Sequence, residues 1–146
     1  MRQDDPESRE KSLQCHWNTP IYLEGYVYGS SGRHESNAEL RCVDWKTREA
    51  RWSEPGLTRS SLLLIDGHFI CLGEYGQVTL FKANPEKFEP VTQIDLAAPP
   101  GGKLDAGSDQ RRLLDYPCWA APIVSHGLLY LRGDTKLMCL ELIPKQ

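Results

Sequence analysis

The residues best suited to chemistry in this chain are its histidines and carboxylates, and their spacing argues against a shared site. The four histidines, which occur singly and never at HxH or HxxxH spacing, are His16, His34, His68 and His126. The carboxylates considered as possible ligands are scattered along the chain, at Glu24, Asp66, Glu74, Asp105, Asp109 and Asp115. They form no D-x-D-x-D-G calcium loop, and the histidines have no cysteine partner at metal-ligand spacing. The sequence therefore predicts no metal-binding residue.

Patterns for nucleophilic or phosphate chemistry are also missing. No G-x-S-x-G elbow occurs, and neither of the stretches 29–32 (GSSG) and 99–102 (PPGG) has both the lysine and the following helix of a phosphate-binding loop. The five cysteines, an odd number with no CxxC pair, are Cys15, Cys42, Cys71, Cys118 and Cys139. Cys42, Cys71 and Cys139 lie in alternating apolar segments and are predicted to be buried as small hydrophobic residues. A pairing of Cys15 with Cys118 stays open. We predict no catalytic or cofactor-binding residue.

The composition is that of one globular domain. The chain has 146 residues, of which 40% are hydrophobic and 25% charged. A net charge of −3 provides no basic field for nucleic acid or an anionic membrane. The longest apolar run, LLLI at 62–65, is too short to span a bilayer. The charged N-terminus has no apolar core of a signal peptide, so the chain as written looks cytoplasmic, although its compartment stays open.

A repeat organises the elements that would position these residues. WNTPIYLEGYVYG (17–29) and WAAPIVSHGLLYL (119–131) share Trp, Pro, Ile, Gly and Tyr in one register. Each repeat unit reads as an apolar strand, a turn at Gly25, Gly67 or Gly127, a second strand and, after a loop, a third strand. His68 and His126 flank two of these glycines and are interpreted as exposed turn residues, as is Asp66. We predict an all-β chain of about eleven strands, whose repeat of about 40 residues is typical of four-stranded β-propeller blades.

The predicted layout has three incomplete blades. Residues 1–14 are expected to be a disordered lead-in and 143–146 a tail. The blades cover about 15–56, 57–96 and 118–142, and the last lacks a fourth strand. The insertion 97–117 is interpreted as a long surface loop and, because it contains Arg111, Arg112 and an exposed Tyr116, as the best candidate for a ligand contact. Closed propellers have four to eight blades, so we expect a fragment of a longer propeller or self-association through open blade edges.

The segment LRCVDWKTREARW (40–52) resembles the repeat of the PQQ-like, or quinoprotein alcohol dehydrogenase-like, β-propellers. Their pattern is Leu-x-Ala-Leu-Asp-x-x-Thr-Gly-x-x-x-Trp. The matching residues are Leu40, Cys42, Val43, Asp44, Thr47 and Trp52. Arg48 replaces the turn glycine. Over about 15–142 the chain is similar to uncharacterised bacterial proteins of this type, which implies the fold more strongly than a function. A full-length family member would be extracytoplasmic, in the periplasm.

Two functions follow as expectations. The first is a non-catalytic propeller module without a cofactor, a fragment of a larger protein that binds a protein, an unknown ligand or further blades, and no nucleic acid. The alternative is part of a PQQ-dependent alcohol or sugar dehydrogenase, whose PQQ and Ca²⁺ residues lie outside this chain. The resemblance would then imply a cofactor stacked on a tryptophan, although the family's adjacent cysteine pair is absent. Trp17, Trp45 and Trp119 are instead expected to pack between blades. A truncated reading frame without a function of its own stays a third alternative.

Overall fold

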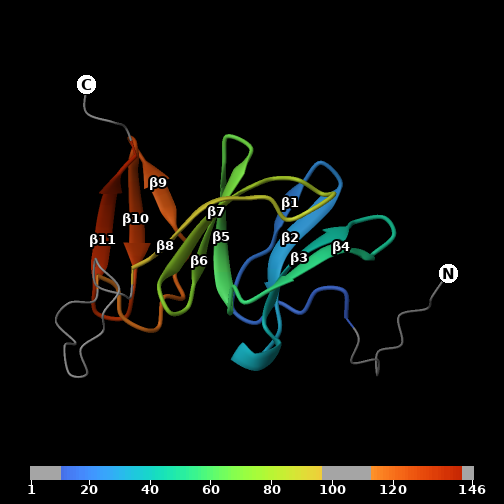
Figure 1. The fold of residues 1–146 in the computed structure, drawn as a ribbon, viewed down its shortest axis with the longest axis horizontal. Coiled ribbons are helices and arrows are strands. Elements are labelled where there is room, and N and C mark those ends of the chain that lie inside the picture. Colours follow the sequence, from blue (N-terminus) through green and yellow to red (C-terminus); the bar gives the residue numbers. More distant parts are fainter. Residues whose placement is uncertain (1–10, 97–112, 143–146) are drawn as a thin grey trace.

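The chain folds into three antiparallel β-sheets that stand side by side in sequence order (Figure 1). A computed structural model describes residues 11–96 and 113–142. The first sheet contains, in order, β1 (Ile21–Leu23), β2 (Tyr26–Ser31), β3 (Glu39–Asp44) and β4 (Ala50–Pro55). The middle sheet contains β5 (Ser60–Ile65), β6 (His68–Gly73), β7 (Gln77–Lys82) and β8 (Pro90–Asp95). The third sheet contains β9 (Ile123–Ser125), β10 (Leu128–Arg132) and β11 (Leu137–Glu141).

The all-β prediction is confirmed. The described residues form eleven strands in sheets of four, four and three, and their one helical element is the short 3-10 turn η1 (Glu35–Asn37). In each sheet the strands are neighbours in the order in which they follow one another along the chain, and none of the sheets closes on itself.

Each sheet opens with a tight two-residue hairpin. The turn pairs are Glu24–Gly25, Asp66–Gly67 and His126–Gly127. Both residues of each pair have positive φ, and the non-glycine members have values between 45° and 51°. Two consecutive positive φ angles are the signature of the type I′ turn, whose twist matches that of the flanking strands. The interpretation of Asp66 and His126 as turn residues therefore holds.

Strands β5 to β7 of the middle sheet bury side chains on both faces, because side chains alternate along each strand, whereas β8 is exposed. On β6, Phe69 and Cys71 pack toward the first sheet, whereas Ile70 and Leu72 pack toward the third. Toward the first sheet the rings stack closely: Tyr28 and Phe69 have centroids 4.7 Å apart, and Phe69 and Phe81 5.1 Å. Ring pairs at these distances add to the free energy gained from burial alone.

Trp52 on β4 joins the first and middle sheets. Its ring lies 6.0 Å from Tyr28 and 6.4 Å from Phe81, and its Nε1 donates a hydrogen bond of 2.9 Å to the carbonyl of Asn84. Trp52 therefore packs between the first and middle sheets. Trp45, in contrast, does not pack between sheets as expected, because it is 65% exposed and contacts Tyr22 at 6.1 Å on the other side of the first sheet.

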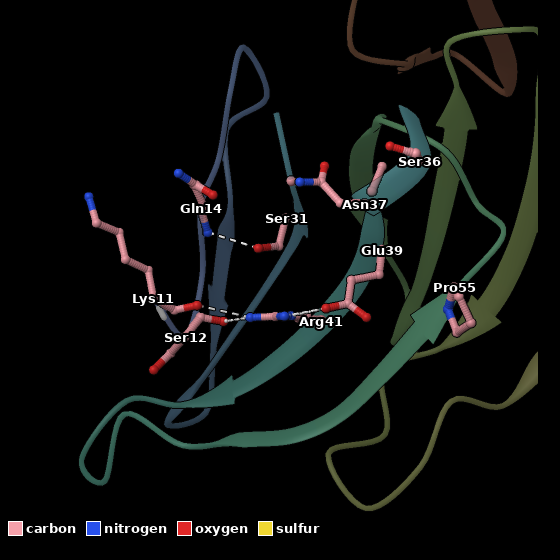
Figure 2. A pocket seen from close by; sticks show the side chains of 11 residues that line it. Lys11, Ser12, Gln14, Ser31, Ser36, Asn37, Glu39, Arg41 and Pro55 are labelled. Carbon is pink, nitrogen blue, oxygen red and sulfur yellow. Dashed lines mark hydrogen bonds and ion pairs between the residues drawn. The ribbon is translucent and has the colours of Figure 1, made fainter. Parts of the chain in front are cut away.

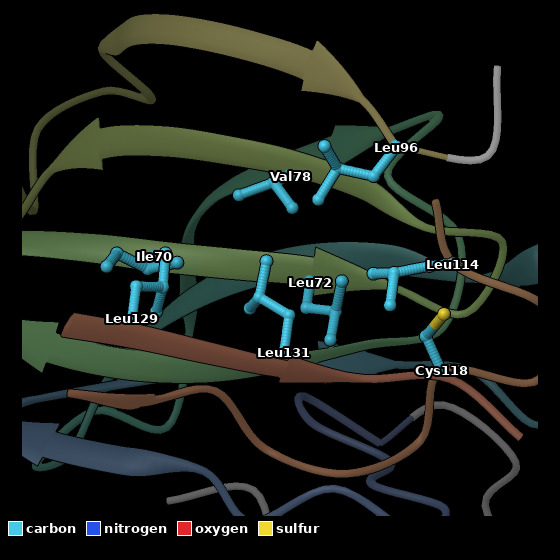
Figure 3. Close-up of a cluster of buried hydrophobic side chains, with 8 residues drawn as sticks. All are labelled: Ile70, Leu72, Val78, Leu96, Leu114, Cys118, Leu129 and Leu131. Carbon is cyan, nitrogen blue, oxygen red and sulfur yellow. The ribbon is translucent and has the colours of Figure 1, made fainter. Parts of the chain in front are cut away.

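A second apolar cluster joins the middle and third sheets (Figure 3). Its buried members are Ile70, Leu72, Val78, Leu96, Leu114, Cys118, Leu129 and Leu131. Leu114 lies within the predicted surface insertion 97–117, yet it is fully buried, and its amide donates to the carbonyl of Leu96 at 3.1 Å. The surface-loop prediction is therefore wrong for Leu114, while residues 97–112 lie outside the described part of the chain.

The segment 11–14 lies against the side of the first sheet that faces away from the middle sheet. The carbonyl of Gln14 accepts a hydrogen bond from the amide of Gly32 at 3.0 Å, and its amide donates to Ser31 Oγ at 2.9 Å. A Cβ added at Gly29 would lie 3.1 Å from Pro20 Cβ and 3.5 Å from Leu13 Cδ2, so Pro20 is the closer neighbour at this position. Residues 11–14 of the predicted disordered lead-in are therefore held against the first sheet, and residues 1–10 lie outside the described range.

Candidate functional site

The side of the third sheet that faces away from the middle sheet carries an exposed apolar surface. Leu129 and Leu131 point into the cluster with the middle sheet, so their alternating neighbours on β10 point the other way. We call this surface the open face and define it by Ile123, Leu128, Tyr130, Leu137 and Cys139. Ile123 is 60% exposed and Leu137 70%, values that are high for side chains on a regular sheet.

The open face repeats a face that is buried elsewhere in the same molecule. In the first sheet the cross-strand row Ile21, Tyr28 and Cys42 packs toward the middle sheet. In the third sheet the row at the same register is Ile123, Tyr130 and Cys139. Leu40 precedes Cys42 by two residues, as Leu137 precedes Cys139. Tyr28, Leu40 and Cys42 are at most 1% exposed, whereas Ile123, Leu137 and Cys139 of the corresponding set are exposed.

All five cysteine thiols are free, and the burial of Cys42 and Cys139 differs as the faces of the first and third sheets differ. Cys42, Cys71 and Cys118 are buried, and burial raises the pKa of each thiol to about 11. Cys139 is exposed, so the prediction that it is buried is wrong for the chain as described. Its neighbours have the expected alternation, but no described residue covers the face to which it belongs.

Thiol labelling checks this division. In dilute folded protein near neutral pH, iodoacetamide is expected to modify Cys139 rapidly and to leave Cys42, Cys71 and Cys118 unmodified, because only a thiolate that the reagent can reach reacts. Mass spectrometry of peptides after timed quenching measures each site. A Cys139 rate as slow as that of Cys42 would show that the open face is covered in the single chain.

A buried ion pair closes one end of the middle sheet. Arg59, just before β5, donates from Nε and Nη2 to the two carboxylate oxygens of Glu74 at 2.9 and 2.5 Å. Glu74 is fully buried, and its hydrogen bonds raise the pKa of the Arg59 guanidinium. The carbonyl of Glu74 also accepts the amide of Cys118 at 2.9 Å. The backbone of Glu74 therefore connects the lead-in of the third sheet to the middle sheet. Its carboxylate is fully paired with Arg59, which makes it a structural group.

A row of aromatic rings runs beside this ion pair. Tyr75 stacks on Tyr116 with centroids 5.0 Å apart, Tyr116 meets Trp119 at 6.3 Å, and Trp119 meets Trp17 at 5.9 Å. Trp17 and Trp119 are the two tryptophans of the sequence repeat, so the repeat brings the lead-ins of the first and third sheets together. Tyr116 and Trp119 are both about half exposed, which agrees with the exposed Tyr116 expected at the end of the insertion.

A polar groove of about 710 Å³ lies where segment 11–14 crosses the first sheet (Figure 2). Arg41 in its floor pairs with Glu39 at 2.6 Å. It also donates to the carbonyls of Lys11 and Ser12 at 3.0 and 2.8 Å. The guanidinium thus anchors the segment to the sheet. The groove therefore results from the anchoring of segment 11–14, and the partners of the Arg41 guanidinium are groups of this chain.

The remaining titratable residues are dispersed over turns. Asp115 accepts hydrogen bonds from the Thr135 hydroxyl and amide, which lower its pKa, and Asp44 accepts the amides of Lys46 and Thr47. Within 11–96 and 113–142, no three residues of the His, Cys, Asp or Glu types converge as metal ligands. Asp105 and Asp109 lie outside this range. The ring nitrogen Nδ1 of His68 lies 2.9 Å from the carbonyl of the neighbouring Asp66.

Comparisons with known proteins do not assign the chain. No protein-family model matches it, and no curated protein matches it significantly. In the described part of the chain, no helix has the length and apolar character needed to cross a membrane.

Proposed function

We propose that the chain is an arc of three propeller blades of the PQQ-like repeat type, and that it serves as a non-catalytic scaffold. Three features support this. Strands are neighbours in chain order within each sheet, consecutive sheets pack face to face, and a Trp17/Trp119 motif marks the start of the first and third sheets. Stacking of short antiparallel sheets in sequence order is the way propellers are assembled. In this proposal the arc belongs to a larger propeller-like assembly.

The observation that carries the scaffold role is the open face. The residue types that bury the first sheet against the middle sheet recur in the third sheet, where no described residue covers them. An apolar face of this kind on a sheet marks an interaction surface. The partner is therefore expected to present an antiparallel sheet with apolar side chains, as the middle sheet does to the first.

No set of Ca²⁺ ligands among the described residues supports the alternative of a PQQ-dependent dehydrogenase fragment. Calcium takes six to eight oxygen ligands, largely from carboxylates, and the described residues bring no such set together. Glu74 and Asp115, two of the carboxylates considered from the sequence, are held by Arg59 and Thr135. The described residues do not fit this ion, and we derive no chemical step from it.

A cofactor assay tests whether this chain is itself non-catalytic. Purified protein incubated with PQQ and Ca²⁺ is expected to show no reduction of an artificial dye with alcohols or sugars. We also expect no cofactor-dependent change in the melting temperature, because no described residue set fits the ion. A known PQQ dehydrogenase, run in parallel, controls for the activity of the reagents. Turnover above that of boiled protein, or a rise in melting temperature that needs both PQQ and Ca²⁺, would reject the non-catalytic scaffold.

A further inference from the structure

We infer that the open face binds the open face of a second copy of this chain, in a two-fold symmetric dimer. The inference rests on the proposed function, because it names the sheet that covers the scaffold's exposed surface. It differs from an extension of the propeller along one polypeptide, since the covering sheet comes from an identical molecule.

The outward faces of the first and third sheets differ in how they are covered. At the first sheet, segment 11–14 covers the part of the outward face around Ser31 and Arg41, whereas Tyr22 and Trp45 on the same side are exposed. At the third sheet, no described residue supplies an equivalent cover. A head-to-tail contact would have to displace the segment, whereas a contact between two third sheets leaves both covered ends outside.

The open face is self-complementary in one orientation. The row Ile123, Tyr130 and Cys139 crosses its centre. One end of the face carries Glu141, paired in register with Leu128, and the other carries Arg132, paired with Leu137.

A two-fold axis that lies in the interface and runs across the strands places the Arg132 end of one copy over the Glu141 end of the other. The apolar row then packs on itself at the centre, between opposite charges at both ends. An axis along the strands would instead oppose Arg132 with Arg132, which disfavours that dimer.

The same two-fold symmetry determines where the two Cys139 thiols lie in the dimer. The residue is on the central row, so the axis that pairs opposite charges brings the two Cys139 thiols of the dimer to the same part of the interface. A three-stranded face is at the small end of specific protein interfaces, so we expect a dissociation constant of roughly micromolar order.

Sedimentation velocity over a range of protein concentrations tests the dimer. The chain is expected to pass from monomer to dimer as its concentration rises, and Leu137→Lys is expected to weaken dimerisation at least about tenfold, since a lysine would be buried in the interface. Leu137 is largely exposed in the single chain, so the variant should fold. Val91→Lys is the matched control, because Val91 is an exposed apolar residue on β8, away from the open face.

Charge exchange tests the orientation independently. Arg132→Glu and Glu141→Arg should each weaken the dimer, and the double variant should restore it, because the two positions oppose each other across the interface. A short bifunctional maleimide should yield covalent dimers with the unsubstituted chain and none with Cys139→Ser.

A chain that stays monomeric at every concentration, or a dimer that Leu137→Lys leaves intact, overturns the second-copy inference. If the chain is monomeric but a β-sheet fused to it covers Cys139, the scaffold proposal stands and only the identity of the partner is wrong. If Cys139 stays reactive in that fusion as well, the scaffold proposal fails too. A dimer that forms but does not respond to charge exchange rejects the proposed axis.

Discussion

Replacing Arg59 with methionine is expected to lower the free energy of unfolding by about 3–5 kcal/mol, because it leaves the carboxylate of Glu74 buried without a partner. The pair makes two hydrogen bonds, and Glu74 has no exposed surface through which water could replace the guanidinium. Urea unfolding followed by tryptophan fluorescence measures the loss. The double variant Arg59→Met/Glu74→Leu should recover most of it, because neither charge is then buried.

Arg51→Met is the matched control for this prediction. Arg51 also makes two hydrogen bonds to one carboxylate, that of Glu86, at 2.9 Å each, but both side chains are exposed. Exposed ion pairs contribute at most about 1 kcal/mol, so this variant should be nearly as stable as the unsubstituted chain. Equal effects of Arg59→Met and Arg51→Met would contradict the burial of the Arg59–Glu74 pair.

Leu40→Ala and Leu137→Ala make the same chemical change at equivalent positions of the repeat and should differ widely in effect. Leu40 is fully buried between the first and middle sheets, so its truncation should cost about 2–5 kcal/mol through lost burial and a residual cavity. Leu137 is 70% exposed, so its truncation in dilute protein should change stability by no more than about 0.5 kcal/mol.

The difference between these two variants is the quantity to measure, by urea unfolding at a concentration where the chain is monomeric. At high concentration Leu137→Ala should become more costly, because Leu137 is then buried by the partner. A loss of several kcal/mol for Leu137→Ala in dilute protein would mean that the third sheet is already covered within the single chain. A negligible loss for Leu40→Ala would contradict the packing of the first sheet on the middle one.

The local features of the fold were predictable from sequence because they depend on neighbouring residues. Two-residue turns such as Asp66–Gly67 are favoured by residues that tolerate positive φ, and they define the hairpins that begin the sheets. The pattern from Asp44 to Thr47 likewise specifies its own turn, since the Asp44 carboxylate accepts the amides of Lys46 and Thr47. Arg48 occupies the glycine position of that pattern with φ of 63°, so the turn persists in spite of the substitution.

The features that sequence reasoning missed depend on which sheets pack together. Cys139 alternates with apolar residues as Cys42 does, and periodicity cannot reveal that only Cys42 has a sheet beside it. Leu114 was assigned to a loop because glycine, proline and charged residues precede it, yet it fills the gap between the middle and third sheets. The Arg59–Glu74 pair joins residues from the two ends of a hairpin, and single-residue types gave no signal for it.

The central claim is that the open face is a repeated sheet-docking surface, and covering it with a sheet tests this most directly. Residues 57–96 can be fused after residue 142 through a flexible linker, so that a second copy of the middle sheet is held beside the third. A control fusion of equal length carries Phe69→Ser and Phe81→Ser in the added copy, which removes the ring that packs on Tyr28 in the first sheet's interface and the ring stacked on it.

The measurement is the rate at which iodoacetamide modifies Cys139 in dilute protein. We expect the fusion to slow this rate at least about tenfold, to a value near that of Cys42, and the control fusion to leave it unchanged, because burial excludes the reagent and disfavours the thiolate. Equal Cys139 rates in the two fusions would contradict the claim that the third sheet presents the docking face of the first.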